Sequence, residues 1–202
     1  ALKLAQHFID WSNGDGYAQR KRYARYLEKK DMPDKWVSTP PSYLESLEPN
    51  WARLRCFTMD SARQFRPEPH WPYSTDTNSR FYKETMEVYN VVKNNKESDL
   101  AWFWDDNCKA TKFYGHYMER NFKQTPIGHW INISGYIIRL KKLPLDEATE
   151  AHALVSVSIA EAILSTWAEK YASELVRPVT YINRLIDSKW MPILETPYFP
   201  EH

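Results

Sequence analysis

The chain has 202 residues, which is enough for one substantial hydrophobic core or for a core with an appendage. Its formal net charge of +1 argues against a dedicated nucleic-acid-binding protein, which is usually strongly basic. No uninterrupted run of 18 or more apolar residues occurs, so the sequence predicts no membrane span. Cys56 and Cys108 are too few for a disulfide framework, and the sequence does not show whether they pair.

Residues 1–77 are predicted to form an irregular entry region. Leu4, Phe8 and Trp11 have the spacing of one helical face. A cluster of basic residues among tyrosines at 17–30 favours an amphipathic helix with a solvated basic face, ended by Pro33. Residues 33–77 are rich in proline and aromatic side chains, which is typical of an extended segment packed against a helical core.

Helix signals become clear after residue 77. Asn78 or Ser79 can cap a helix that ends near residues 94–95, and Ser98 can cap a short helix that ends at Trp104. The next two carboxylates, Asp105 and Asp106, are interpreted as a solvated helix end rather than as ligands. Residues 109–115 are predicted to be a loop. No segment has the period of a strand, so the predicted fold class is all-α.

Two further helices follow. Thr125 and Pro126 have the residue types preferred at the N-cap and first position of a helix, and that helix is expected to end at Lys141. Asp146 is then predicted to cap a central helix over residues 146–176, about 45 Å long. Apolar side chains crowd almost every face of it, which predicts a buried helix surrounded by other helices. These side chains are Leu154, Val155, Val157, Ile159, Ala162, Ile163 and Trp167.

Lys170 and Arg177 lie near the end of this predicted helix. Seven positions are about two turns, so both cations should leave the same side about 10 Å apart and could converge on one oxyanion. The alternative is two solvated cations near a helix C-terminus, where the helix dipole favours them. Pro178 disfavours helical backbone at Arg177, which places this arginine where the helix stops or bends.

The region from Lys170 to Glu201 resembles a known family. Lys170, six residues, Arg177 and Pro178 are followed by a Trp-x-Pro-Ile-Leu segment from Trp190 and a Thr-Pro-x-Phe-Pro-Glu segment ending at Glu201. This combination is similar to the soluble bacterial branch of the vanadium-dependent haloperoxidases and the related type-2 phosphatidic acid phosphatases. Similar segments near Trp36 and Trp104 extend the resemblance over most of the chain. It implies a helical bundle of the vanadium chloroperoxidase and acid phosphatase type.

The resemblance also implies a function. Lys170 and Arg177 would form half of a phosphate- or vanadate-binding pocket, serving either phosphate-ester hydrolysis or peroxide-dependent halide oxidation with vanadate as cofactor. His129, within a Gly-His-Trp also found in the relatives, is a candidate pocket residue, although a hydrogen-bonded core histidine is the alternative. The sequence predicts no side chain that ligates a metal directly.

The family's second motif, Pro-Ser-Gly-His, should begin one or two residues after Glu201, and its third motif, with a catalytic histidine, matches nothing here. We therefore expect residues 1–202 to be the N-terminal part of one longer helical domain, with residues 78–202 as its helical core. The missing C-terminal part of the same protein would be its partner, and the chain alone would be inactive. The resemblance favours a periplasmic or cell-envelope location. A different interpretation is a non-catalytic helical module that binds a partner through its aromatic and proline-rich region.

Overall fold

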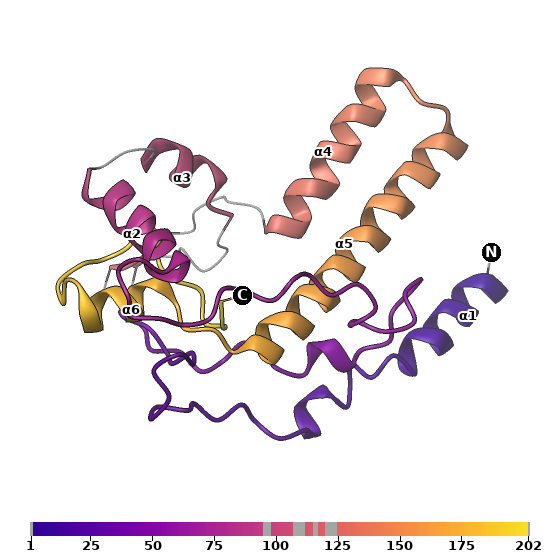
Figure 1. Cartoon of the computed structure of the whole chain (residues 1–202). Coiled ribbons are helices and arrows are strands. Elements are labelled where there is room, and N and C mark those ends of the chain that lie inside the picture. The colour runs from indigo at the N-terminus through magenta and orange to yellow at the C-terminus, as the bar shows by residue number, and fades with distance from the viewer. Residues whose placement is uncertain (1, 95–97, 107–111, 115–116, 120–124, 202) are drawn as a thin grey trace. The chain divides into compact units, whose positions relative to one another are not determined.

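The computed structural model describes residues 2–94, 98–106, 112–114, 117–119 and 125–201. The helices are α1 Leu2–Asn13, α2 Arg80–Lys93, α3 Ser98–Trp104, α4 Pro126–Lys141, α5 Leu145–Ser173 and α6 Pro178–Leu185, with short 3-10 turns η1 Arg20–Arg22 and η2 Trp51–Arg53 (Figure 1). The all-α prediction is confirmed. The loop predicted over 109–115 is wrong for residues 112–114, because β1 Lys112–Tyr114 pairs in antiparallel fashion with β2 Tyr117–Glu119, and the rest of that range lies outside the described residues.

The predicted helix starts are set by side-chain caps. The Ser79 hydroxyl accepts a hydrogen bond from the Tyr82 N–H at 3.2 Å and begins α2. The Thr125 hydroxyl accepts one from the Gly128 N–H at 3.0 Å and begins α4, with proline in the first turn. Helix α5 begins one residue earlier than predicted, so Asp146 lies in the first turn and does not cap the helix. A negative charge is favourable there, because it lies near the positive end of the helix dipole.

The basic segment at 17–30 is not the amphipathic helix that the sequence predicted. Only η1 is helical there, and residues 24–29 have no regular structure. Side-chain contacts explain the difference. The Tyr26 ring lies 5.7 Å from the Trp36 ring and 5.6 Å from the Tyr171 ring, while Arg20 bonds the Glu48 carboxylate at 3.1 Å. These long-range contacts determine the path of the backbone and override the local helical preference.

The chain divides into two compact units. The first comprises Ala1–Lys96, Glu161–Pro192 and Thr196–His202, and the second comprises Glu97–Ala160 and Ile193–Glu195. The prediction of one domain stays a prediction. Two clusters of buried residues form the core of the first unit. In one, α2 packs on α6 through Tyr89, Val179, Ile182 and Trp190. In the other, α5 meets the segment before α2 through Ala62, Leu164 and Ala168.

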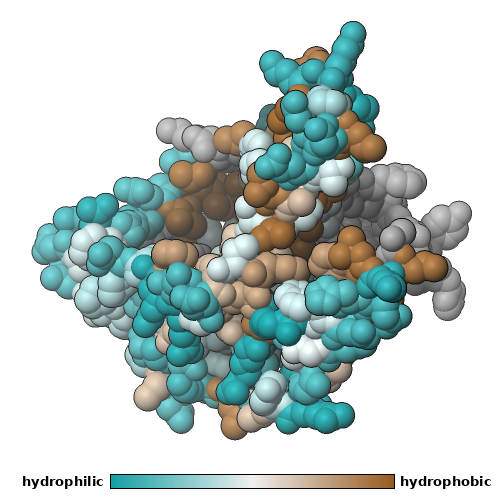
Figure 2. Space-filling view, turned by 90° about the vertical axis from the view of Figure 1, so that its right-hand side faces the viewer, coloured by the Kyte–Doolittle hydropathy of each residue, from teal (hydrophilic) through white to brown (hydrophobic). Residues whose placement is uncertain are grey.

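Helix α5 is not buried along its length, contrary to the sequence prediction. Its buried residues are all in its C-terminal half, namely Glu161, Leu164, Ala168 and Lys170. Leu154 is 61% exposed, and Ile159 and Trp167 are only half-buried. By length and composition alone, this helix is apolar enough to cross a membrane. The sequence prediction did not find this, because it required an uninterrupted run of apolar residues. Apolar surface is visible in several places in Figure 2.

A buried carboxylate joins α5 to the irregular region. Glu161 accepts hydrogen bonds from the backbone N–H groups of Phe57, Thr58 and Met59, the last two at 3.2 and 2.9 Å. Burial alone raises the pKa of Glu161, but these hydrogen bonds together outweigh it and leave the pKa below its ordinary value of 4.5. The carboxylate therefore holds residues 57–59 on α5 most strongly when it is ionised.

We predict that Glu161→Gln lowers the free energy of unfolding by about 3 kcal/mol at neutral pH, because the negative charge is lost and only one of the two amide atoms is an acceptor, so at least one of the three N–H groups loses its partner. The folded-state pKa is lowered, so this stabilisation is present above the unfolded pKa and is lost as the pH falls through the folded value. Denaturant unfolding across acidic pH measures both effects. Glu150→Gln, on an exposed turn of the same helix, is the matched control. Equal stabilities of the two variants would contradict the anchoring role.

Candidate functional site

Lys170 and Arg177 do not lie on one helix as predicted. Helix α5 ends at Ser173, and Glu174 has a left-handed backbone with a φ of 53°. Arg177 is extended, with φ −73° and ψ 145°, and is the N-cap residue of α6, in which Pro178 is the first residue. The prediction that Pro178 keeps Arg177 out of a helix is confirmed. The two cations nevertheless lie close to each other, although the backbone between them is not helical.

A short ladder of extended segments follows the end of α5. Leu175 forms isolated antiparallel bridges with Lys35 on one side and with Glu201 on the other. The Trp36 N–H donates to the Glu174 carbonyl at 2.7 Å, and the Glu201 N–H donates to the Leu175 carbonyl at 3.0 Å. Three segments that are distant in sequence thus lie side by side. As a result, the backbone of Glu201 is held next to the end of α5.

The carboxylate of Glu201 contacts both predicted cations. Its Oε2 accepts a hydrogen bond from Arg177 Nη1 at 2.7 Å, and its Oε1 lies 3.7 Å from Lys170 Nζ. Nε and Nη2 of Arg177 both donate to the Phe199 carbonyl, at 2.9 and 2.8 Å. The guanidinium is therefore fixed on two sides. Each oxygen of one anionic group faces a different cation.

An aromatic ring also contacts the cation pair. Lys170 Nζ lies 5.0 Å and Arg177 Cζ lies 4.9 Å from the centroid of the Phe199 ring. The Trp167 ring packs against Phe199 with centroids 5.0 Å apart, and its indole N–H donates to the Leu47 carbonyl at 3.1 Å. Cation–π attraction favours this placement of both charges. The ring also limits how far either cation can move.

Lys170 and Arg177 are both buried, which disfavours their charged forms. Burial is the largest cause of the lowered pKa of Lys170. The Glu201 carboxylate opposes this shift, whereas the neighbouring charge of Arg177 adds to it. Burial likewise lowers the pKa of Arg177, with Glu201 opposing it. The cost of burying two like charges is reduced by one carboxylate. The three groups together carry a formal charge of +1.

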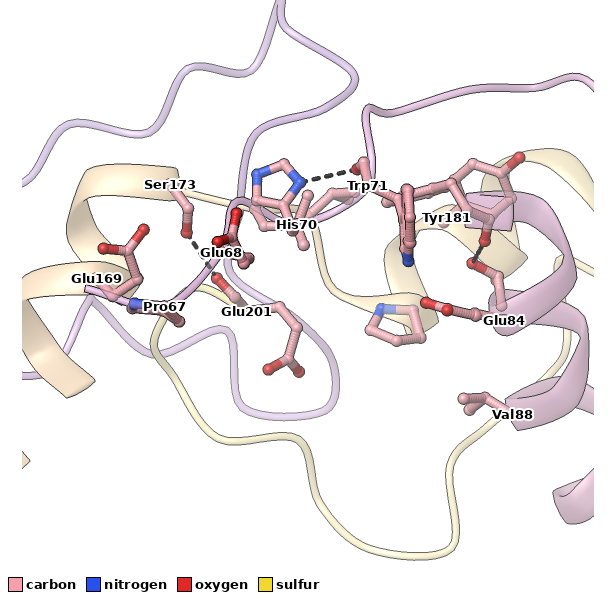
Figure 3. A pocket seen from close by; sticks show the side chains of 15 residues that line it. Pro67, Glu68, His70, Trp71, Glu84, Val88, Glu169, Ser173, Tyr181 and Glu201 are labelled. Atoms are coloured by element: carbon pink, nitrogen blue, oxygen red, sulfur yellow. Dashed lines mark hydrogen bonds between the residues drawn. The ribbon is translucent and has the colours of Figure 1, made fainter. Parts of the chain in front are cut away.

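Glu201 also lines a cavity of about 460 Å³ in the first unit. Figure 3 shows the cavity between the loop that carries Glu68, His70 and Trp71, the start of α6 and helix α2, which carries Glu84. The hydroxyl of Ser173 donates to the Glu201 carbonyl at 3.1 Å beside it. The cavity therefore adjoins the cation pair through Glu201. The sequence missed both Glu201 and Phe199 as site residues, although both lie in the Thr-Pro-x-Phe-Pro-Glu segment that it singled out.

His129, the third predicted site residue, belongs to the second unit. Its Nδ1 lies 2.7 Å from Asp106 Oδ2, and its ring stacks on Trp104 with centroids 5.9 Å apart. The alternative of a hydrogen-bonded histidine therefore describes it better, although its side chain is 30% exposed and not in a core. The interpretation of Asp106 as a solvated helix end is wrong, because it is the partner of His129 and is 18% exposed.

Other candidate groups add nothing to the site. Within the part of the chain that the structure describes, no group of three His, Cys, Asp or Glu side chains is placed to hold a metal ion. Cys56 is a partly buried free thiol, and Cys108 lies outside the described residues.

The chain is similar over its whole length to a solved structure. That structure is of a bacterial vanadium-dependent iodoperoxidase, with 38% sequence identity and a TM-score of 0.90. The resemblance to the haloperoxidase-like superfamily, predicted from the sequence, is confirmed over the length of this chain. The match covers 100% of this chain but only 48% of the iodoperoxidase chain, so this chain spans about half the length of that protein. No protein-family model and no curated protein matches it.

The burial of Lys170 yields a stability prediction. Because its pKa is lowered in the folded state, charged Lys170 costs stability at neutral pH, and that cost is relieved as the pH rises through the folded-state pKa. We expect Lys170→Met to raise the free energy of unfolding by about 1 kcal/mol, since an apolar side chain of similar length replaces a buried charge. Thermal unfolding compared with Lys141→Met, an exposed control, measures this. A loss of stability confined to the Lys170 variant would contradict it.

Proposed function

We propose that Lys170 and Arg177 bind a tetrahedral oxyanion and that this chain contributes that half of the oxyanion pocket to a haloperoxidase-like enzyme. The observation that carries the proposal is the geometry of Glu201. Its two oxygens contact the two cations separately, as two oxygens of one phosphate or vanadate could. Arginine contributes a planar fork and lysine a compact point charge, a combination suited to such anions.

The residues present fit vanadate in charge and in donor chemistry. Lys170 and Arg177 are buried, positive and close to one anionic group, while Phe199 restrains both. Vanadate bound there would supply the chemistry of peroxide-dependent halide oxidation. The role of this chain's residues is to neutralise charge on the anion's oxygens and to orient them. The histidine that the family resemblance places in a later motif would come from polypeptide outside this chain.

The likeness to an iodoperoxidase favours halide and peroxide as substrates over a phosphate ester. Acid phosphatase chemistry remains the second candidate, because a phosphoryl group in transfer presents the same equatorial oxygens to the same two cations. The two can be separated in an enzyme that contains this chain. Vanadate should activate a haloperoxidase, whereas it should inhibit a phosphatase as a transition-state analogue.

We predict that Arg177→Lys weakens orthovanadate and phosphate binding to this chain tenfold to a hundredfold, since a fork that makes charge-assisted bonds is replaced by a point charge. A loss of about 1.5–3 kcal/mol corresponds to that range. Arg177→Ala should lose more. Isothermal titration calorimetry measures both. Arg184→Lys, on exposed α6 surface, is the matched control and should bind like the wild type.

Near-wild-type affinity in both Arg177 variants, with unfolding temperatures showing that they are folded, would refute the oxyanion function. It would return the chain to the alternative of a partner-binding helical module. In an enzyme that contains this chain, the same Arg177→Lys change should lower kcat/KM about a hundredfold, or about 3 kcal/mol, because one contact to the charged transition state is lost.

Residues 1–202 alone should show neither phosphatase nor haloperoxidase turnover, because they contain no match to the motif with the catalytic histidine. Assays of generic phosphomonoester hydrolysis and of peroxide-dependent iodide oxidation measure this. Turnover by the pure chain would contradict the prediction. It would make His129 a candidate for a catalytic role, and His129→Ala would then test it.

A further inference from the structure

The carboxylate of Glu201 stands where an oxyanion would bind. Its Oε2 is 2.7 Å from Arg177 Nη1 and its Oε1 is 3.7 Å from Lys170 Nζ. Any anion that contacts both cations must share them with this carboxylate or replace it. We propose that Glu201 is a specificity-determining residue, the resting counterion of the site, which an incoming oxyanion displaces. This inference rests on the proposed oxyanion function.

At Glu201 the backbone is held by hydrogen bonds, while the side chain is more exposed than either cation that it contacts. The backbone N–H is bonded to the Leu175 carbonyl at 3.0 Å, and the backbone carbonyl accepts from the Ser173 hydroxyl at 3.1 Å. The Glu201 side chain is 30% exposed, whereas those of Lys170 and Arg177 are each 8% exposed. Of the three charged groups, the Glu201 carboxylate therefore has the most open surroundings, and rotation about its own side-chain bonds would move it away from the cations without moving the backbone.

The adjoining cavity supplies the space for that rotation. Its volume of about 460 Å³ far exceeds that of a carboxylate group, and Glu201 is part of its lining (Figure 3). The lining includes the carboxylates of Glu68, Glu84 and Glu169 and contains neither lysine nor arginine. A displaced Glu201 therefore finds room in the cavity but neither lysine nor arginine in its lining, and Arg66 and Arg80, which contact lining carboxylates, already pair with Glu169 and Glu84. Moving the Glu201 carboxylate away from Lys170 and Arg177 has an electrostatic cost, which the incoming anion must offset.

This cost determines which anions bind. The electrostatic free energy that a monoanion such as nitrate gains from the two cations is no larger than the one that the Glu201 carboxylate loses. Nitrate should therefore not displace Glu201. A dianion such as hydrogen phosphate or hydrogen vanadate carries twice the charge and gains more than is lost. The site should therefore select doubly charged oxyanions, and Glu201 should be the source of the selection.

The test is calorimetric titration of this chain with phosphate at mildly alkaline pH, where phosphate is mainly a dianion, and separately with nitrate. Glu201→Gln keeps the side-chain shape and a hydrogen-bond acceptor but removes the competing charge. We expect it to bind phosphate at least about tenfold more tightly than the wild type and to gain measurable nitrate binding. Glu169→Gln, another cavity carboxylate, which pairs with Arg66 at 2.9 Å, is the matched control and should leave both affinities unchanged.

Glu201→Asp provides a second variant in which the carboxylate is kept but shortened. It should reach both cations less well and bind phosphate with an affinity between those of the wild type and Glu201→Gln. Weaker or unchanged phosphate binding in Glu201→Gln would overturn the proposal, because Glu201 would then position the cations or stand apart from the anion. Absence of phosphate binding in every protein would instead refute the oxyanion function itself.

Discussion

The burial of two cations beside one carboxylate is the constraint on which the site depends. Charges of like sign inside a protein are costly, and an uncompensated pair would not persist in a packed region. Glu201 compensates one charge, the Phe199 carbonyl accepts two hydrogen bonds from Arg177, and the Phe199 ring faces both cations. The remaining positive charge makes the site receptive to an anion. The same feature that limits stability therefore supports binding.

The surrounding fold supplies what this cluster needs. Helix α5 carries Lys170, Glu174 has a left-handed backbone just after the helix ends, and Pro178 keeps Arg177 extended at the start of α6. The ladder around Leu175 then brings Glu201 to the pair. Further along α5, the Glu161 carboxylate fastens the irregular segment at 57–59. The Glu161 carboxylate and the apolar cluster of Leu164 and Ala168 thus join the C-terminal half of α5 to the first unit.

Local sequence signals predicted local structure well. Ser79 and Thr125 act as caps because their hydroxyls reach backbone N–H groups three residues ahead, which needs no tertiary context. The meeting of Lys170 and Arg177 was also predicted, but through the wrong geometry. Two turns of helix and an interrupted helix can both leave residues seven apart near each other, and only Pro178 indicated the interruption.

Features that depend on distant residues could not be predicted. The aromatic contacts of Tyr26 with Trp36 and Tyr171 override a helical pattern, and nothing in the local sequence encodes them. The pairing of Asp106 with His129 joins residues 23 positions apart. The exposure of Leu154 depends on which elements pack beside α5, which apolar periodicity does not reveal. Glu201 lay within a recognised segment, but its partners became evident only from the fold.

The central claim is that Lys170 and Arg177 act together on one oxyanion. The most direct measurement follows the side-chain nitrogen resonances of both residues by NMR while orthovanadate is added to the chain. If one anion contacts both cations, the Lys170 Nζ and Arg177 Nε signals should shift together and saturate with a single dissociation constant. Shifts with separate midpoints, or a response from only one of the two residues, would contradict the account.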